Sequence, residues 1–262
     1  MINMHFLKDN TASLNVKINE WMDHHKAVYS NFFGLDNTKA YEYIITEHSV
    51  LIRMKEFYFY RIYFLSDDKG ELENLLLGLN DVEYVFNLPT KKPFDEWDAL
   101  LKTSGFDYYE TYTKYNMDMS TKQLSSVDHV EDAKAEESEE IMNLLMEGLP
   151  IYTAHLPEME RLLQLISEKK VRVTRDGNGH VDGVCISYVI GSTASGDAWV
   201  NKGEHGLDLL MDMYNGFINN GAKRYLFWVR DSNTKVRKMY IRSGAVSLGI
   251  KDYTYVKYKK TN

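Results

Sequence analysis

The stretch AWVNKGEHGLDLLMDMYNGFINNGAK, residues 198–223, decides the fold that the sequence predicts. A short apolar run ends at Val200, and a loop with two glycines follows. Large apolar residues then recur every three or four positions, which predicts a helix over 206–220. Free N–H groups and the positive dipole end at the start of such a helix favour a bound phosphate, and glycines let the ligand approach the backbone.

The residues on either side of this stretch predict a mixed α/β unit. Upstream, the pattern indicates two helices (139–148 and 156–169), a hairpin that turns at 176–179, and a short strand (195–201). Downstream, it indicates a strand (223–230), a helix (233–243) and a long final strand (246–259). Residues 120–140 are polar and acidic, so we expect a boundary there between domains at 1–120 and 121–262.

The first half of the chain predicts a related series of elements. The pattern favours one amphipathic helix over 12–32, two or three strands within 41–65, a helix over 69–79, a strand over 82–88, a helix over 93–105 that a proline opens, and a long strand over 106–119. The order helix, strand, helix, Ser-Gly, Tyr-rich strand occurs at 69–118 and again at 206–258. This recurrence predicts an internal repeat of two related α/β units.

Composition and charge narrow the class of protein. The 262 residues carry 31 Lys and Arg against 38 Asp and Glu, a net charge of −7, and 44% are hydrophobic, which excludes a disordered or fibrous chain. Residues 201–262 hold 12 basic and 5 acidic side chains, a local charge of +7 that suits either an anionic ligand or a solvated end. The overall charge disfavours nucleic acid. A single cysteine, Cys185, and the lack of a long apolar run predict a cytoplasmic protein without a membrane span.

Three stretches together resemble the GNAT family of acetyl-CoA-dependent N-acetyltransferases: residues 198–223, YLFWVRDSN (225–233) and SNTKVRKMYIRSGA (232–245). The resemblance covers roughly half of the chain and implies an α/β fold with a GNAT-like mixed central sheet flanked by helices. It also implies acetyl-CoA or another acyl-CoA as co-substrate, an amine as acceptor, and no metal. The first half resembles a degenerate GNAT-like unit in tandem, because Phe94 and Leu101 stand where Asn233 and Tyr240 stand in the second half.

The same resemblance places the pyrophosphate of the cofactor on the loop before the helix at 206–220. The residues that it implies as cofactor-binding are Trp199, Val200, Asn201, Lys202, Gly203, His205, Gly206, Asn233 and Arg237. The loop departs from the family pattern, because Asn201 stands at the basic or glutamine position and Glu204 at the first glycine. An acidic side chain is unfavourable beside pyrophosphate, so either the loop uses Gly203 or affinity for the cofactor is reduced. An ordinary loop between strand and helix is the alternative interpretation.

Tyr240 lies seven residues after Asn233, about two helical turns, so both lie on one face of a helix that starts near Asn233. The resemblance implies that Tyr240 is the general acid that protonates the departing coenzyme A thiolate. It implies that Asn233 contacts the pantetheine or caps the helix. A buried aromatic residue is the alternative for Tyr240.

The general base is not fixed by a motif. Asp197 lies two residues from Trp199 on a predicted strand, hence on the same face, and we expect it to receive the proton of the amine. Glu147 and His155 flank the predicted acceptor-side helices and are alternatives. An ordinary surface or turn role is open for all three residues.

Other chemistries find little support. The eight histidines show no metal-ligand spacing, and the adjacent His24 and His25 point in different directions on a helix. Cys185 lies in a predicted buried strand, and neither a nucleophile elbow nor a P-loop is present. The sequence therefore predicts an N-acyltransferase. A non-catalytic acyl-CoA-binding or interaction module and an aminoacyl-tRNA-dependent transferase are the alternatives, and neither the acceptor nor the oligomeric state is indicated.

Overall fold

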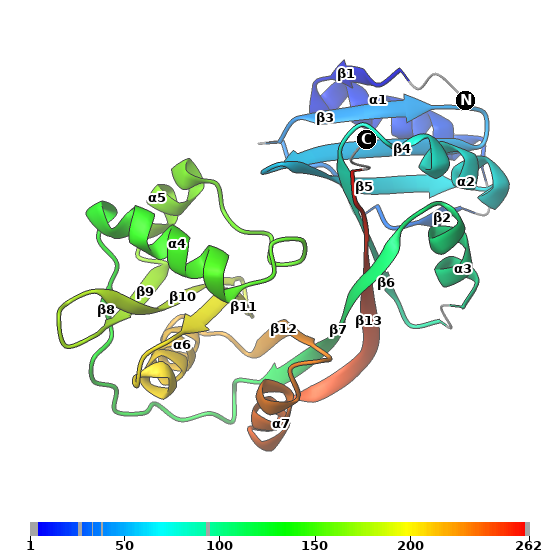
Figure 1. Cartoon of the computed structure of the whole chain (residues 1–262). Coiled ribbons are helices and arrows are strands. Elements are labelled where there is room, and N and C mark those ends of the chain that lie inside the picture. The colour runs from blue at the N-terminus through cyan, green and yellow to red at the C-terminus, as the bar shows by residue number, and fades with distance from the viewer. Residues whose placement is uncertain (1–4, 26–27, 33, 38, 93–94, 260–262) are drawn as a thin grey trace. The chain divides into compact units, whose positions relative to one another are not determined.

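The computed structural model describes residues 5–25, 28–32, 34–37, 39–92 and 95–259, and the chain groups into two compact units (Figure 1). Unit 1 comprises residues 1–113, 230–232 and 249–262, and unit 2 comprises residues 114–229 and 233–248. Strands β7 (Asp107–Asp118) and β13 (Val246–Lys257) each supply residues to both units. The second half of the last strand thus belongs to unit 1, which a linear division of the chain near residue 120 does not anticipate.

Unit 1 is a mixed sheet with three helices. Its strands lie in the order β1-β3-β4-β5-β6-β13, and β2 pairs with β5. The elements are β1 (Leu7–Asp9), α1 (Thr11–Asp23), β2 (Tyr29–Ser30), β3 (Tyr41–Ile45), β4 (Ser49–Glu56), β5 (Phe59–Ser66), α2 (Lys69–Gly78), β6 (Glu83–Thr90) and α3 (Asp95–Thr103). Strands β5 and β6 run parallel, and the other pairs in this unit are antiparallel.

Most of the predicted elements of unit 1 are confirmed, with one correction. Residues 41–65 form three strands, and the helix and strand after them agree with the prediction to within two residues. The single helix expected over 12–32 is wrong, because α1 ends at Asp23 and residues 29–30 form β2. Leu14, Ile18 and Trp21 bury the inner face of α1, whereas Val28 and Phe32 lie beyond its end. The proline expected to open α3 and the neighbouring Phe94 lie outside the described residues.

Unit 2 is a sheet in the order β7-β12-β11-β10-β9-β8. Its further elements are β8 (Glu131–Asp132), a 3₁₀ turn (Ala135–Glu137), α4 (Ser138–Gly148), α5 (Met159–Ser167), β9 (Val171–Arg175), β10 (Val181–Ile190), β11 (Thr193–Asn201), α6 (Gly206–Asn219), β12 (Arg224–Arg230) and α7 (Thr234–Arg242). Helices α4 and α5 lie over one face of β9–β11, and α6 lies over the other (Figure 1). From α4 onward these elements follow the predicted order, whereas β8 and the 3₁₀ turn lie in the polar stretch 120–140, for which no element was predicted.

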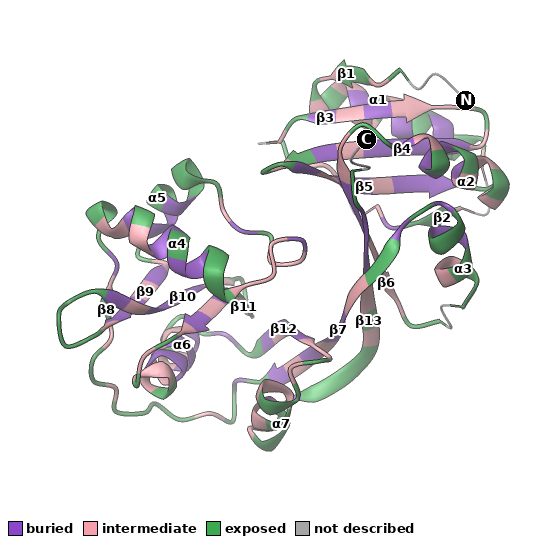
Figure 2. Cartoon of the chain, in the orientation of Figure 1, coloured by how far each residue is buried: buried purple, intermediate pink, exposed green. Residues whose placement is uncertain are grey.

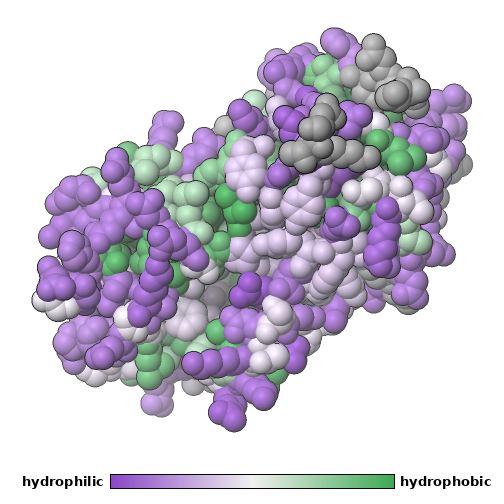
Figure 3. Space-filling view, in the orientation of Figure 1, coloured by the Kyte–Doolittle hydropathy of each residue, from purple (hydrophilic) through white to green (hydrophobic). Residues whose placement is uncertain are grey.

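The core of unit 2 therefore has two layers, one on each face of the sheet, and buried positions run along the strands (Figure 2). Cys185 is fully buried on the α6 side, where burial raises the pKa of its thiol to about 12, as expected of a structural thiol. Hydrophilic side chains cover most of the face drawn in Figure 3. Among the described helices, none combines the length and apolar character that crossing a membrane requires.

A layer of polar side chains crosses the interior of unit 1. Arg61 on β5 is 1% exposed, and its guanidinium donates to both carboxylate oxygens of Glu56 at 2.8 and 2.7 Å and to the side-chain oxygen of Asn87. Asn87 in turn donates to Thr254 at 2.8 Å and to Asp252 at 3.2 Å. The other carboxylate oxygen of Asp252 is buried without a hydrogen-bond partner. Asp252 is therefore a charge that the fold accommodates poorly.

Stability should depend on pH through Asp252. Burial raises the pKa of its carboxyl from 3.8 to about 6, although the Arg61 charge and the Asn87 hydrogen bond oppose the rise. The folded chain holds a proton that the unfolded chain releases, so the free energy of unfolding falls as pH rises from about 4 to about 6. Asp252→Asn should abolish this fall and stabilise the protein at pH 7 by up to about 3 kcal/mol. Urea unfolding of both proteins from pH 4 to 8 measures this, and parallel pH profiles would contradict it.

Candidate active site

Parallel strands β11 and β12 diverge near the middle of unit 2. They pair at two positions, Thr193 with Arg224 and Ala194 with Tyr225, and the ladder between them then ends. Strand β11 also carries a bulge toward β10, because Ile186 faces Ala198 whereas the next residue faces Gly196. Asp197 is the extra residue. The strands thus separate at a defined point, and their backbone beyond it is positioned to face a ligand.

Because of the bulge, the Asp197 side chain does not have the orientation that the sequence predicts. Trp199 packs into the core on the α6 side, whereas Ala198 and Val200 pack on the α4 side. Asp197 is exposed and accepts a hydrogen bond from Ser195 Oγ at 3.0 Å. The expectation that Asp197 and Trp199 share a face is wrong, because the extra residue shifts the alternation of side chains by one position.

Tyr240 lies inside unit 2 on the α6 side, where it is 5% exposed. Its ring centroid is 4.4 Å from that of Phe227, and its phenol and that of Tyr225 lie close enough to shift each other's pKa. Burial raises the pKa of the Tyr240 phenol well above 10. The side chain therefore keeps its proton at neutral pH, which is the form a general acid needs, and it also fills the core as a buried aromatic residue would.

Tyr225 belongs to the same place, although it does not stand out among the nineteen tyrosines of the sequence. A Cβ on Gly196 would lie 2.6 Å from Tyr225 Oη, so this hydroxyl approaches the β11 backbone at the bulge. Tyr225 thus connects the point where β11 and β12 diverge with the hydroxyl of Tyr240. In the sequence, the only indication of this contact is a glycine in one strand and a tyrosine in the next. It can be recognised only once the register of the two strands is known.

Gly196→Ala should destabilise the protein by about 1–3 kcal/mol, because Tyr225 is enclosed by other rings and cannot yield without repacking them. Gly216→Ala in α6 is the matched control, since its Cβ meets nothing within 4 Å and alanine favours a helix. Urea unfolding compares the two variants. Equal stability of both would show that the Tyr225 hydroxyl is not confined at the bulge.

Side chains of unit 2 contact the loop between β11 and α6 and fill the space around it. Asn201 Nδ2 donates to the Gly203 carbonyl at 2.7 Å, and Lys202 forms an ion pair with Glu147. A Cβ on Gly203 would lie 1.8 Å from a carboxylate oxygen of Asp182, and a Cβ on Gly206 would lie 2.6 Å from the Asn201 amide nitrogen. Contacts within the protein therefore already require both glycines. Val200 packs against α4, where a Cβ on Gly148 would lie 2.3 Å from Val200 Cγ1.

The start of α6 has no capping side chain. His205 occupies the N-cap position without a side-chain capping bond, and its ring stacks on that of His129 at 4.1 Å. Side chains cap α1, α2 and α7, namely Asn10, Asp68 and Asn233. The first N–H groups of α6 are thus not used by a capping side chain and can receive an anion. Glu204 and Asp208 place negative charge next to them, which weakens this preference.

The remaining predicted residues lie on α7 and near α4. Asn233 Oδ1 accepts from the Val236 backbone N–H at 3.2 Å, so Asn233 is the N-cap of α7. Arg237 is half-buried, and within the described part of the chain no hydrogen bond or ion pair engages its guanidinium. Glu147 is engaged by Lys202, and His155 is exposed with a φ of 46°. Neither alternative base lies on the bulged strand.

In unit 1 the chain itself fills the equivalent divergence of parallel strands. Strands β5 and β6 pair over four positions that end at Ile62, and β2 pairs with the end of β5. Buried Asn31 then bridges the gap, because its Nδ2 donates to the carbonyls of Ile62 at 3.0 Å and Asn87 at 2.8 Å. Its Oδ1 accepts from the Phe64 backbone N–H at 2.8 Å. The side chain of Asn31 thus hydrogen-bonds the strand backbone where β5 and β6 diverge in unit 1.

Solved structures match this chain, whereas no protein-family model and no curated protein does. An acetyltransferase of the GNAT family from Colwellia psychrerythraea is 13% identical, with a TM-score of 0.56 over 98% of this chain and 100% of its own. A tandem GNAT protein from the clavulanic acid biosynthesis pathway is 10% identical, with a TM-score of 0.58 over 98% and 99% of the two chains. A GCN5-related glucosamine N-acetyltransferase region of a fungal β-N-acetylglucosaminidase is 10% identical, with a TM-score of 0.62 over 98% and 38%.

These similarities confirm the predicted fold class, a mixed α/β fold of the GNAT type with helices flanking the sheet. At 10–13% identity they concern the fold, and the chemistry has to be argued from the residues of this chain.

Proposed function

We propose that the protein is a cytoplasmic N-acyltransferase that transfers an acyl group from acetyl-CoA or another acyl-CoA to an amine, and that unit 2 carries the reaction. The observation that carries this proposal is the divergence of β11 and β12 at a bulge, with the neighbouring hydroxyls of Tyr225 and Tyr240 beside it. This arrangement occurs in a chain with a GNAT-type fold. It combines strand backbone that can hold a thioester with a protonated phenol.

The cofactor would bind along the C-terminal part of β11 and the start of α6. The α6 N–H groups would receive the pyrophosphate, and Lys202 and Arg237 would supply positive charge. Lys202 would have to leave Glu147 to do so. The proposed contacts are those of Trp199, Val200, Asn201, Lys202, Gly203, His205, Gly206, Asn233 and Arg237.

The chain's own groups would then move two protons during the transfer. As the amine attacks the thioester carbonyl carbon, a C–N bond forms and the C–S bond breaks. Asp197 would accept the amine proton, directly or through water, and Tyr240 Oη would give its proton to the departing sulfur. Tyr225 would help to position the Tyr240 hydroxyl, because the two phenols lie close together.

Unit 1 would be a degenerate GNAT-like unit in tandem with unit 2 that does not bind acyl-CoA. The Asn31 bridge supports this, because it uses the strand backbone that a thioester would need. The start of α2 adds support, since Asp68 caps it and Glu71 lies in its first turn. The Asp68 side chain accepts from N–H groups that an anion would need, whereas no side chain caps the start of α6.

A non-catalytic acyl-CoA-binding module is the second candidate function. The raised pKa of Tyr240 favours it, because a more weakly acidic phenol gives up its proton less readily. Release of free coenzyme A thiol from acetyl-CoA, measured with a panel of polyamines, amino sugars and lysine peptides, separates the two functions. Amine-dependent release supports an acyltransferase. Acetyl-CoA binding without release on any amine would favour the binding module.

A further inference from the structure

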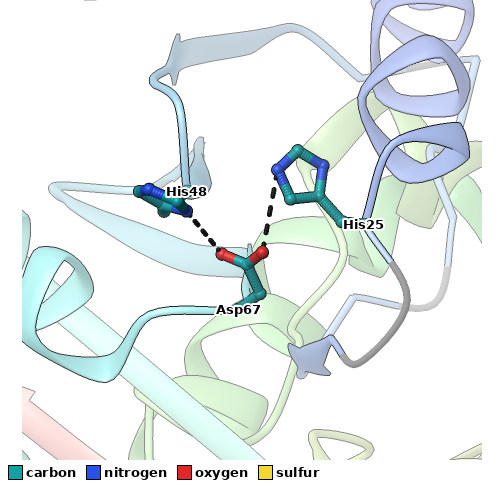
Figure 4. Close-up of side chains that lie close together, drawn as sticks. All are labelled: His25, His48 and Asp67. Carbon is teal, nitrogen blue, oxygen red and sulfur yellow. Dashed lines mark hydrogen bonds and ion pairs between the residues drawn. The ribbon is translucent and has the colours of Figure 1, made fainter.

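Three side chains from separate elements of unit 1 meet beside the end of α1 (Figure 4). His25 follows α1, His48 lies in the turn between β3 and β4, and Asp67 follows β5. One carboxylate oxygen of Asp67 lies 3.0 Å from His48 Nδ1, and the other lies 3.7 Å from His25 Nε2. One nitrogen or oxygen from each of the three side chains lies within 4.8 Å of the other two.

We propose that His25, His48 and Asp67 bind a divalent transition-metal ion of the zinc class. Two imidazole nitrogens and one carboxylate oxygen are ligands that zinc commonly takes in proteins. With metal–ligand distances of about 2.0–2.1 Å, neighbouring ligand atoms of a tetrahedral zinc site lie roughly 3.3–3.4 Å apart. The two distances, one to each carboxylate oxygen of Asp67, lie on either side of this separation, and one ligand atom of each residue lies within 4.8 Å of the others, so the side chains would have to move closer together to complete the site.

The His25 imidazole also has an acceptor for the nitrogen that would not bind metal. His25 Nδ1 lies 2.6 Å from the Trp21 carbonyl oxygen, and the His25 ring stacks on the Trp21 indole at 3.9 Å. His48 Nε2 lies 3.9 Å from a carboxylate oxygen of Glu47, which is beyond hydrogen-bond distance. An acceptor such as the Trp21 carbonyl keeps the proton on the outer nitrogen and orients the lone pair of the other nitrogen toward the metal.

The second nitrogen of His25 gives an independent reason for a cation. His25 Nε2 lies 2.9 Å from the Glu47 carbonyl oxygen and faces the Asp67 carboxylate. When the proton of a neutral ring is on Nδ1, the Nε2 lone pair points at two oxygen atoms. A metal ion among these atoms satisfies all three, and the Glu47 carbonyl oxygen supplies a fourth ligand. A second proton on the His25 ring would also satisfy them, and the experiment below separates the two cases.

A metal here would fasten the end of α1 to two strand ends. It would hold the chain just before residues 29–31, where β2 and Asn31 fill the gap between β5 and β6. His25 and His48 are 23 residues apart in sequence (48 − 25), and His48 and Asp67 are 19 apart (67 − 48). No local sequence motif therefore indicates the site. The proposed role of the metal ion is structural. The proposal therefore does not depend on whether unit 2 transfers acyl groups.

Zinc titration of the full chain tests the proposal. Chelator-treated protein, titrated with zinc chloride against a chromophoric chelator, should bind about one equivalent. His48→Ala and Asp67→Asn should each weaken binding at least about tenfold and abolish the rise in melting temperature that zinc produces. His24→Ala, next to the site and exposed, and His205→Ala in unit 2 are the matched controls and should bind as the wild type does.

Cobalt gives a second measurement, because its absorption spectrum reports a tetrahedral site with nitrogen and oxygen ligands. Wild type should show this spectrum and Asp67→Asn should not, while circular dichroism confirms that the variant is folded. Absence of saturable binding would overturn the proposal in favour of a protonated His25 paired with Asp67. Equal affinity in all four variants would overturn it in favour of dispersed surface histidines.

Discussion

Tyr240→Phe should lower kcat for acyl transfer by about 10²–10⁴-fold, the range that general acid catalysis contributes. The substitution removes the hydroxyl that we propose gives its proton to the departing sulfur, but it keeps the ring that packs on Phe227. It also removes a polar group next to the buried Tyr225 hydroxyl, so the folding free energy of the variant has to be measured as well. Rates should therefore be measured well below the melting temperature of the variant, with acyl-CoA at saturation.

Tyr214→Phe is the matched control for Tyr240→Phe. Tyr214 lies in the same aromatic cluster, and its hydroxyl is buried without a hydrogen-bond partner. Its removal should leave kcat unchanged and stability equal or higher. A wild-type kcat in the Tyr240→Phe variant would show that Tyr240 does not act in the mechanism. So would a fall of kcat in the Tyr214→Phe variant as large as that in Tyr240→Phe.

Arg61→Met should destabilise the fold by about 3–5 kcal/mol, which is the cost of leaving a buried charge without its partner. Arg61 is 1% exposed, and its loss would leave the Glu56 carboxylate without two charged hydrogen bonds and Asn87 without a donor. The double change Arg61→Met with Glu56→Leu should recover most of this stability, because the Glu56 carboxylate is then no longer left without its partner. Urea unfolding monitored by circular dichroism measures all three proteins.

Lys102→Met serves as the control for Arg61→Met. Lys102 pairs with Asp98 on the surface of α3, where the lysine side chain is 58% exposed. Its replacement should change stability by no more than about 0.5 kcal/mol. If Arg61→Met lowers the free energy of unfolding no more than Lys102→Met does, the polar layer of unit 1 does not stabilise the sheet.

Features that depend on neighbouring residues were predictable from the sequence. The spacing of Leu210, Tyr214 and their neighbours predicts α6, and Asn233 predicts the start of α7, because helix periodicity and capping are local. The end of α1 at Asp23 was not predictable. Apolar residues continue at helical spacing to Phe32, whereas His25 turns back onto carbonyls that include one from the β3–β4 turn.

The candidate site was predictable only where its residues lie close together in sequence. Asn233 and Tyr240 are seven residues apart, whereas Tyr225 approaches Gly196 across two strands and Asn31 reaches Asn87 across 56 residues. The bulge at Asp197 depends on how β10 and β11 pair. Register and long-range contacts of this kind follow from packing of the whole unit, and a single strand's pattern does not contain them.

Isothermal titration of the full chain with acetyl-CoA tests most directly whether unit 2 binds acyl-CoA at the start of α6. We expect saturable binding of about one equivalent, weakened at least about tenfold by Leu207→Glu, which adds an exposed carboxylate to the first turn of α6. Leu77→Glu, which adds the same charge to α2 in unit 1, should leave binding unchanged. Absence of binding at millimolar acetyl-CoA, or equal binding by both variants, would contradict the assignment of the cofactor to unit 2.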